Sequence, residues 1–201
     1  MIPVALSSHA QIRRFAESLK VSNAPDTTHH EAKRAAVAVL IRLGAAGTPE
    51  IFLIARAQYD GDPWSGQIAF PGGREEPGDE SLYDTAARET LEETGIDIRT
   101  NGELLGALDD LHPLTVRLLA VIVRPFVVLV ADIPQVRHSR EVAKSFWVPL
   151  SSLLDHAAWR DTTVVAGGHE FSRLAFHHEG YVVWGMTERI LSGLIAGMGV
   201  V

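Results

Sequence analysis

The 201-residue sequence contains no cysteine, so disulfide bonds and thiolate metal sites are both excluded. Positive charge is also scarce, because 18 lysines and arginines stand against 25 aspartates and glutamates, for a formal net charge of −7. Broad contact with a nucleic-acid backbone needs a concentrated basic surface, and we therefore expect no nucleic-acid partner. Phosphate groups are not excluded as ligands, since a bound metal ion or a local group of arginines can supply positive charge.

Long apolar runs are missing as well. The longest, LLAVIVRPFVVLVA at 118–131, is interrupted by Arg124 and Pro125, and it predicts paired strands and no membrane span. The first residues, MIPVALSSHAQIRRF, lack the basic segment followed by an apolar run that is typical of a secretion signal. We therefore expect a soluble, cytoplasmic protein without a membrane partner.

The chain has enough apolar residues for one compact domain, since 46 % of it is hydrophobic. Residues 8–20 place Ile12, Phe15 and Leu19 at helical spacing and predict an amphipathic helix. The polar, turn-rich stretch at 21–33 indicates a linker. We accordingly divide the chain into an N-terminal helix and linker at 1–32 and a main domain at 33–201.

The main domain mixes strand and helix patterns. Strands are predicted at 34–43, 50–57, 66–70, 101–110 and 115–130. A strand that leads into a short helix is predicted at 145–156, and a hairpin within 162–178. Helices are predicted at 80–94 and 186–197. Gly95 follows the first of these helices, where a left-handed C-cap would fall. This order of elements predicts an α/β fold, a sandwich built around a mixed β-sheet.

The segment LYDTAARETLEETGI at 82–96 places three glutamates on one helix face. Residues three and four apart lie side by side on a helix, so Glu89, Glu92 and Glu93 converge. Their repulsion costs about 0.2–0.5 kcal/mol per exposed pair. A solvated acidic face is the common interpretation of an isolated E-x-x-E-E. A divalent cation would instead remove the repulsion, because carboxylate oxygens are ligands that Mg²⁺ prefers.

Two neighbouring features favour the metal site over the solvated face. Gly72 and Gly73 precede the helix in FPGGREEPGDE at 70–80, where they let the backbone turn sharply and approach a ligand. Arg88 lies next to Glu89 and one turn before Glu92, a position from which a guanidinium can hold carboxylates in place.

Together these residues resemble the signature of the Nudix hydrolase family, G-x5-E-x7-R-E-U-x-E-E-x-G-U, in which U is an aliphatic residue. The matching positions are Gly73, Glu80, Arg88, Glu89, Glu92, Glu93, Gly95 and Ile96. The chain departs from the signature twice: the spacing from Gly73 to Glu80 is one residue longer, and Thr90 replaces an aliphatic residue. The extra residue lies in the loop before the helix and leaves the spacing of the glutamates unchanged.

The resemblance implies an α/β/α sandwich and the hydrolysis of a diphosphate linked to another group, with Mg²⁺ or Mn²⁺ as cofactor. Glu89 and Glu93 would be the principal metal ligands, assisted by Glu92 and by the carbonyl of Gly73. Arg88 would orient the carboxylates. A small-molecule nucleoside diphosphate derivative is the expected partner.

The general base is left open by the sequence. A water that attacks phosphorus must lose a proton, and Glu92, Glu93 or Glu141 could accept it. Glu141 lies in HSREVAKSFWVPL at 138–150, where an exposed loop acid is the simpler interpretation.

Residues outside the signature bear on the substrate. The stretch LIARAQYDGDPWSGQIAFPGGREEPGD at 53–79 resembles the corresponding segment of coenzyme A pyrophosphatases, with Arg56, Gly66 and the FPGG at 70–73 in matching positions. Asp62 stands where that subgroup carries a basic residue, and an acidic side chain there would oppose binding of the 3′-phosphate of coenzyme A. Coenzyme A or an acyl derivative is the first candidate substrate, and ADP-ribose, a dinucleotide or an oxidised nucleotide is the alternative.

Four residues are candidate substrate contacts. Arg56 and Arg74 suit a phosphate if the strands bring both beside the glycine turn, and Gly72 permits a close approach of the backbone. Trp64 could stack on a base, although packing on its own domain is an equal alternative. A third hypothesis, a Nudix-fold binding module without catalysis, is disfavoured because such proteins usually lose part of the glutamate set. The oligomeric state is left open, with a homodimer among the alternatives.

Overall fold

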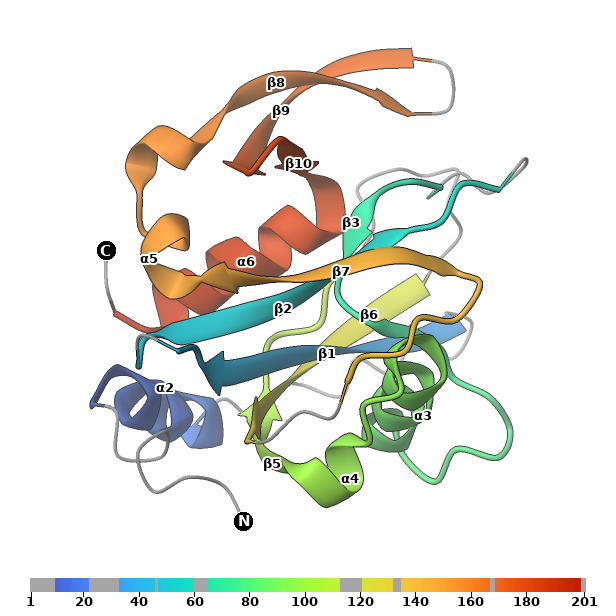
Figure 1. The fold of residues 1–201 in the computed structure, drawn as a ribbon. Coiled ribbons are helices and arrows are strands. Elements are labelled where there is room, and N and C mark those ends of the chain that lie inside the picture. Colours follow the sequence, from blue (N-terminus) through green and yellow to red (C-terminus); the bar gives the residue numbers. More distant parts are fainter. Residues whose placement is uncertain are drawn as a thin grey trace.

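A mixed β-sheet occupies the centre of the structure, a computed structural model that describes residues 10–21, 33–45, 47–59, 65–112, 121–131, 135–166 and 169–199 (Figure 1). Within these residues the sheet has seven strands, with the order β3-β2-β1-β6-β5, while β4 pairs with β1 and β7 with β2. The strands are β1 Lys33–Leu43, β2 Pro49–Arg56, β3 Ile68–Ala69, β4 Gly72–Arg74, β5 Gly102–Ala107, β6 Val121–Val130 and β7 Val142–Pro149.

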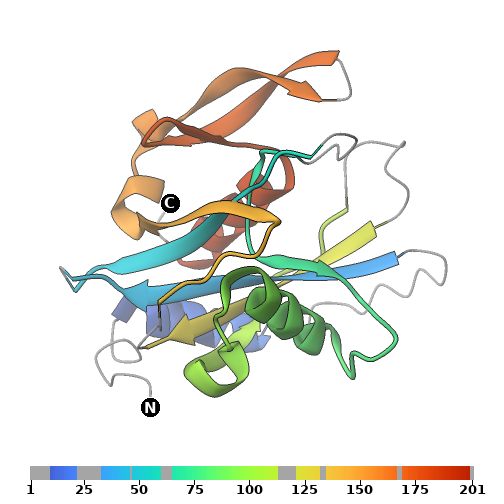
Figure 2. The same cartoon turned by 45° about the vertical axis from the view of Figure 1, so that its right-hand side comes forward.

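Helices cover both faces of this sheet, which confirms the predicted α/β sandwich (Figures 1 and 2). One face is covered by α3 Leu82–Thr94 and the short α4 Ile98–Asn101, and the other by α2 Ala10–Val21 and α6 Gly185–Gly197. No helix in the described part of the chain combines the length and apolar character that crossing a bilayer requires.

Strand β1 is buried on both faces because it lies between the two helical layers. Ala36, Ala38 and Leu40 belong to the core cluster on the α3 side, whereas Val39 and Ile41 belong to the cluster on the side of α2 and α6. Successive side chains of a strand point to opposite faces, so a near-continuous apolar run is what a doubly covered strand requires. The small alanines on the α3 side let that helix approach the sheet closely.

β1 also changes partner along its length. On the edge away from β6, its residues 41–43 pair with β2, whereas residues 35–37 pair with β4. Between these two stretches the amide of Ala38 donates to the carbonyl of Pro71 at 2.8 Å. Because β4 replaces β2 along the first half of β1, the glycine turn enters the sheet directly below α3.

A second, antiparallel sheet packs above α6 in the view of Figure 1. It consists of β8 Trp159–Ala166, β9 His169–His178 and β10 Tyr181–Val183, and the chain reaches it from β7 through α5 Leu150–Leu153 and the 3-10 turn η1 His156–Ala158. The rings of Trp159 and Phe176 pack at 5.1 Å between centroids and join this sheet to the core.

Most predicted elements are confirmed, with differences at the boundaries. The N-terminal helix covers Ala10–Val21, and its Ile12, Phe15 and Leu19 lie in the core cluster on the α6 side. The strand predicted at 66–70 ends at Ala69, because Pro71 has no amide hydrogen with which to continue the ladder. The strand predicted from 145 begins at Val142.

The prediction of paired strands at 118–131 is wrong for the described residues of that stretch. Residues 121–130 form the single strand β6, which runs through Arg124 and Pro125 parallel to β1. The regular pairing with β5 ends at Phe126, and Pro125 takes part beyond it only as an acceptor, through a hydrogen bond from the amide of Leu108 to its carbonyl at 2.9 Å, which needs no N–H on the proline. Residues 113–120 lie outside the described part of the chain.

Candidate active site

The helix that carries the glutamates, α3, has well-defined caps at both ends. Ser81 precedes it in an extended conformation, and its hydroxyl accepts a hydrogen bond from the amide of Asp84 at 3.2 Å. Gly95 ends it with a φ of 72°, as the sequence predicts, and its amide donates to the carbonyl of Leu91 at 2.8 Å. Thr90 is fully buried below the helix and donates to the carbonyl of Ala86 at 2.6 Å, which satisfies its hydroxyl.

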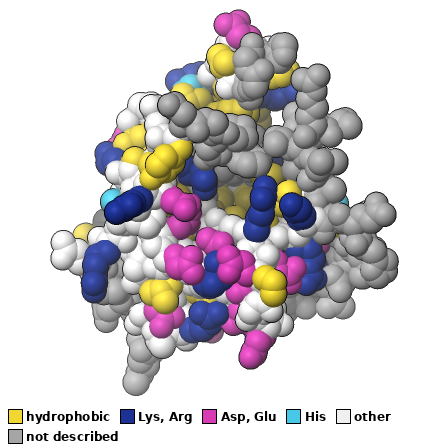
Figure 3. Space-filling view, turned by 90° about the vertical axis from the view of Figure 1, so that its right-hand side faces the viewer, with side chains coloured by type: hydrophobic (Ala, Val, Ile, Leu, Met, Phe, Trp, Pro, Cys, Tyr) yellow, Lys and Arg dark blue, Asp and Glu magenta, His cyan; other side chains and the backbone are white. Residues whose placement is uncertain are grey.

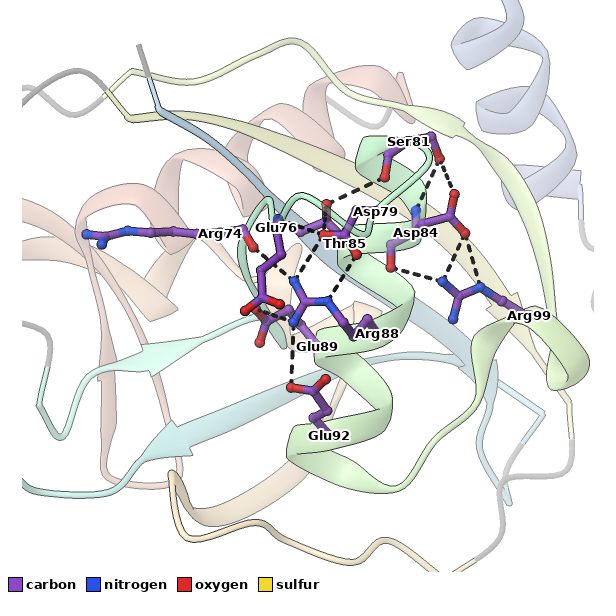
Figure 4. A network of polar contacts seen from close by, with 10 residues as sticks. All are labelled: Arg74, Glu76, Asp79, Ser81, Asp84, Thr85, Arg88, Glu89, Glu92 and Arg99. Atoms are coloured by element: carbon purple, nitrogen blue, oxygen red, sulfur yellow. Dashed lines mark hydrogen bonds and ion pairs between the residues drawn. The ribbon is translucent and has the colours of Figure 1, made fainter. Parts of the chain in front are cut away.

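Arg88 lies at the centre of the polar network on this helix (Figure 4). Its guanidinium donates to both carboxylate oxygens of Asp79, at 3.0 and 3.1 Å, and to Oε1 of Glu89 at 3.0 Å. It also donates to the main-chain carbonyl of Arg74 at 3.0 Å, and its Nη1 lies 3.6 Å from Oε2 of Glu92. Arg88 therefore links the glycine turn, the loop before α3 and two of the glutamates, as expected of a residue that orients them.

The acid that pairs with Arg88 is Asp79, whereas the signature match pointed to Glu80. The carboxylate of Asp79 also accepts from the amide of Glu76 and the hydroxyl of Thr85, each at 2.9 Å, and its side chain is 5 % exposed. The hydrogen bond from Arg88 holds the pKa of Asp79 well below its usual value. Glu80 is exposed. Counting from Gly73, Asp79 restores the five intervening residues of the signature, but eight residues then separate it from Arg88 where the signature has seven, so spacing alone did not distinguish Asp79 from Glu80.

The three glutamates are buried to different extents. The Glu93 residue is only 4 % exposed; its Oε2 accepts from the amide of Gly72 at 3.0 Å, and its Oε1 lies 4.0 Å from Nη1 of Arg56. The side chain of Glu89 is 19 % exposed, while that of Glu92 is 58 % exposed. Glu89 and Glu93 thus face inward, and Glu92 lies at the solvent edge.

Burial also changes the protonation of the two inner glutamates. It raises the pKa of Glu93 to about 7; the Gly72 amide opposes this shift, and the charge of Glu89 adds to it. Burial raises the pKa of Glu89 in the same direction, against the effect of Arg88. Two inward carboxylates that resist ionisation together form a site at which a cation would be strongly favoured.

The burial of Glu93 predicts an unusual pH dependence of stability for the metal-free protein. Its carboxyl has a pKa of about 7 in the folded chain against an ordinary value of 4.5, so folding strengthens proton binding. Acidification should therefore stabilise the fold, beginning near pH 7 and complete near pH 4.5, by at most about 3 kcal/mol. Denaturant unfolding in EDTA measures this, and Glu93→Gln should flatten the curve. If the stability of Glu93→Gln rose equally on acidification, the effect would belong to another titrating group.

Both glycines of the turn are needed for close approaches. A Cβ on Gly73 would lie 2.3 Å from Oε1 of Glu89, so the missing side chain leaves room for that carboxylate. Gly72 has a φ of 151°, and a Cβ there would lie 2.3 Å from the carbonyl oxygen of Ala36. Gly73 makes space for the site, whereas Gly72 makes space for the pairing of β4 with β1.

The remaining candidate residues are placed as follows. Arg56, at the end of β2, reaches the site beside Glu93. The carbonyl of Arg74 joins the network, but its side chain extends away from the glutamates in Figure 4. Glu141 is exposed, and its negative charge acts on both Glu89 and Glu93, raising the pKa of each. Trp64 and Asp62 lie outside the described residues.

The carboxylate oxygens of this site suit a hard divalent cation, although they do not form a complete coordination shell. Among the described residues, no group of three or more acidic or histidine side chains is close enough to hold a metal unaided. Arg88 explains this, because it draws Glu89 and Glu92 toward its guanidinium. The inner carboxylates of Glu89 and Glu93, beside the main chain of Gly73, still provide the oxygen ligands that Mg²⁺ and Mn²⁺ prefer.

One face of the molecule is rich in acidic side chains. Figure 3 shows Asp and Glu side chains gathered at the centre of this face, with Lys and Arg side chains between and beside them. An anionic ligand would be repelled by the carboxylates alone, so this arrangement requires a cation together with arginines such as Arg56 and Arg88.

Comparisons with known proteins bear on the family of this chain. The model of the NUDIX domain matches residues 32–166. The Nudix hydrolase NudL of Salmonella paratyphi B, itself uncharacterised, is 31% identical over 177 residues, which cover 88% of this chain and 89% of that protein. An uncharacterised protein of Schizosaccharomyces pombe is 39% identical over 111 residues, or 53% of this chain and 33% of that protein.

Among solved structures, a MutT/nudix family protein from Enterococcus faecalis has a TM-score of 0.54 at 18% identity, covering 81% of this chain and 61% of that chain, and it bears on the fold alone. The family model and the Salmonella relative, which span the glycine turn and the glutamate helix, establish that this chain belongs to the Nudix hydrolase family.

Proposed function

We propose that this protein uses a divalent metal ion to hydrolyse the diphosphate bond of a nucleoside diphosphate derivative. The observation that carries the proposal is a pair of inward-facing carboxylates, half-buried Glu89 and buried Glu93, held against the glycine turn by Arg88 and by the amide of Gly72. A binding module would have no need to keep two carboxylates at such an electrostatic cost.

In this proposal Glu89 and Glu93 hold Mg²⁺ or Mn²⁺, with Glu92 and the Gly73 carbonyl completing the protein ligands. When bound, the ion neutralises the diphosphate and lowers the pKa of a coordinated water. Arg88 keeps the carboxylates oriented, since its guanidinium is itself fixed by Asp79. Arg56 supplies a positive charge beside Glu93 for a phosphate oxygen.

Glu141 is the proposed proton acceptor. It is exposed, and among the described residues no hydrogen bond or ion pair engages its carboxylate. Glu92 is also exposed, but it lies 3.6 Å from the guanidinium of Arg88, with which it pairs. The carboxylate of Glu93 accepts from the Gly72 amide and would also bind the metal in this proposal.

Coenzyme A or an acyl derivative is the first proposed substrate, supported by the resemblance of residues 53–79 to coenzyme A pyrophosphatases. Addition of water across the diphosphate would yield 4′-phosphopantetheine and 3′,5′-ADP. The acidic Asp62 is the specific observation that favours ADP-ribose or a dinucleotide instead.

A substrate panel with Mg²⁺ and with Mn²⁺ tests the proposal. It should contain coenzyme A, acetyl coenzyme A, dephospho-coenzyme A, ADP-ribose, a dinucleoside polyphosphate and an oxidised nucleotide, with products separated by chromatography. We expect coenzyme A to have the highest kcat/KM, and its ratio to dephospho-coenzyme A measures recognition of the 3′-phosphate. A preference for ADP-ribose or the dinucleotide would exclude coenzyme A as the preferred substrate. No turnover of any compound would favour the binding module.

Substituting Gly73 with alanine should disable this site without unfolding the protein. The new Cβ would displace the Glu89 carboxylate, which can swing away because it ends a flexible side chain. We expect kcat to fall by about 10- to 100-fold, with little change in the unfolding midpoint. Gly72→Ala is the matched comparison: its Cβ would meet the main chain of Ala36 and Val37, at 2.3 and 2.6 Å, and should mainly destabilise the fold. Full activity in Gly73→Ala would show that the function of Glu89 does not require the room left by the missing side chain of Gly73.

A further inference from the structure

The residues before Glu141 are attached to the end of α3. The amide of Arg137 donates to the carbonyl of Thr94 at 2.9 Å, and the amide of Ser139 donates to the carbonyl of Glu93 at 3.0 Å. The last carbonyls of a helix have no partner within the helix, so these bonds also satisfy the C-terminal end of α3. One side of the 137–141 segment is therefore fixed to the main chain of Glu93 itself.

The other side of this segment is attached to the residues that follow β2. The amide of Ala57 donates to the carbonyl of Glu141 at 2.8 Å, and the hydroxyl of Tyr59 donates to the carbonyl of Arg140 at 2.6 Å. Tyr59 is held in turn, because its own amide donates to the hydroxyl of Ser65 at 2.7 Å. The turn that carries Glu141 thus lies between α3 and the exit of β2, with hydrogen bonds on both sides.

The strand pairing directs this turn toward the candidate active site. β2 and β7 are in register up to Ala55 and Lys144, and an irregularity then pairs Arg56 with Val142. Such a bulge bends the strand and changes where its end residues point. Arg56 reaches Glu93 from one side of this pairing. Glu141 immediately precedes Val142 on the other side, in a turn that is bonded to the main chain of Glu93 through the amide of Ser139.

The ring of Tyr59 is too exposed for packing to explain why this residue is a tyrosine. The residue is 49 % exposed, and a phenylalanine would provide the same apolar contact. What the hydroxyl adds is a short hydrogen bond to a main-chain carbonyl 81 residues along the chain. Its effect is to fix the position of the turn, and that turn carries a carboxylate with no other attachment.

We propose that Tyr59 is a positioning residue, whose hydroxyl holds the turn at Arg140 so that Glu141 stays beside the end of α3, next to Glu93. The inference rests on the proposed function, in which Glu141 accepts the proton of the attacking water. It adds a residue outside the signature helix that acts on the reaction only through Glu141.

Tyr59→Phe tests the proposal because it removes only the hydroxyl. With the best substrate of the panel, kcat should fall by about two- to tenfold, KM should change by less than about twofold, and the unfolding midpoint should be nearly unchanged. Tyr83→Phe is the matched control: it removes a hydroxyl that donates to the carbonyl of Ile98 at 3.4 Å, near the start of α3, and activity should be unaffected.

A double-mutant cycle distinguishes positioning of Glu141 from a general structural effect. In the Glu141→Gln background, Tyr59→Phe should cause no further loss of kcat. An equal loss in both backgrounds would overturn the proposal, as would an unchanged kcat in Tyr59→Phe or a wild-type rate in Glu141→Gln.

Hydrogen exchange gives a second readout that does not depend on turnover. In Tyr59→Phe the amides of residues 139–142 should exchange about two- to tenfold faster, while the amides of α3 before Glu93 keep their rates. Unchanged exchange at 139–142 would show that the hydroxyl does not hold the turn. If the wild-type protein hydrolyses no compound of the panel, the proposed function fails by itself, and the exchange measurement still decides the role of Tyr59.

Discussion

Glu93→Gln should lower kcat by roughly a thousandfold or more, equivalent to about 4 kcal/mol of transition-state stabilisation, while the protein stays folded. The substitution keeps the shape of the side chain and an oxygen that can accept from the Gly72 amide at the 3.0 Å distance seen for Glu93. It removes the negative charge that would bind the metal ion. Because burial already disfavours that charge in the metal-free protein, the unfolding midpoint should not fall.

Kinetic assays with Mg²⁺ and Mn²⁺, together with calorimetric titration of Mn²⁺, measure this effect. Metal affinity and kcat should fall together in Glu93→Gln. Glu80→Gln is the control, since Glu80 is an exposed glutamate just before the same helix and is not among the acids that pair with Arg88, which are Asp79, Glu89 and Glu92. Near-normal turnover and metal affinity in Glu93→Gln would show that the metal binds elsewhere.

Asp79→Asn should have the second largest effect, and it should act on both stability and activity. The substitution removes the charged partner that binds Arg88 through two hydrogen bonds, in a pair whose side chains are 21 % and 5 % exposed. Leaving a largely buried charge without its partner costs about 2–4 kcal/mol of folding free energy. The freed guanidinium would no longer hold Glu89 in place, so kcat should fall by about 10- to 100-fold.

Chemical denaturation and steady-state kinetics on Asp79→Asn and Glu80→Gln make a direct comparison of two adjacent acids. The structure predicts losses in the first variant and wild-type behaviour in the second. The opposite result would mean that Glu80 is the functional partner of Arg88. A loss of stability without a loss of activity would mean that the glutamates do not need Arg88 for their orientation.

The glutamate helix was predictable because its determinants are local. The spacing of Glu89, Glu92 and Glu93 places them together on any α-helix, and Gly95 adopts the left-handed conformation predicted for a helix end. Arg88 could be assigned for the same reason, since it lies within one turn of its glutamates. The proximity of Arg56 to Glu93 depends on how the strands pair, and from the sequence it could be stated only as conditional on that pairing.

Loop residues could not be assigned in the same way. The pattern match favoured Glu80, but the loop before α3 brings Asp79 to Arg88, with support from the amide of Glu76 and the hydroxyl of Thr85. A one-residue shift in a loop changes no periodicity, so the sequence pattern carries little information about it. The run at 118–131 was misjudged for a related reason, because whether Pro125 interrupts a strand depends on which of its main-chain groups the neighbouring chain uses, and here the amide of Leu108 uses only the carbonyl.

By itself the sequence determined the α/β class, the family and the face of the helix that carries the carboxylates, because these follow from periodicity and spacing within short segments. Only the tertiary structure decided which acid supports Arg88, how deeply each glutamate is buried, and that Tyr59 bonds to the turn before Glu141, which is itself attached to the end of α3. Contacts between residues as far apart as Tyr59 and Arg140 depend on the course of the whole chain. Burial likewise depends on the layers packed around a residue, and neither quantity is encoded in a local pattern.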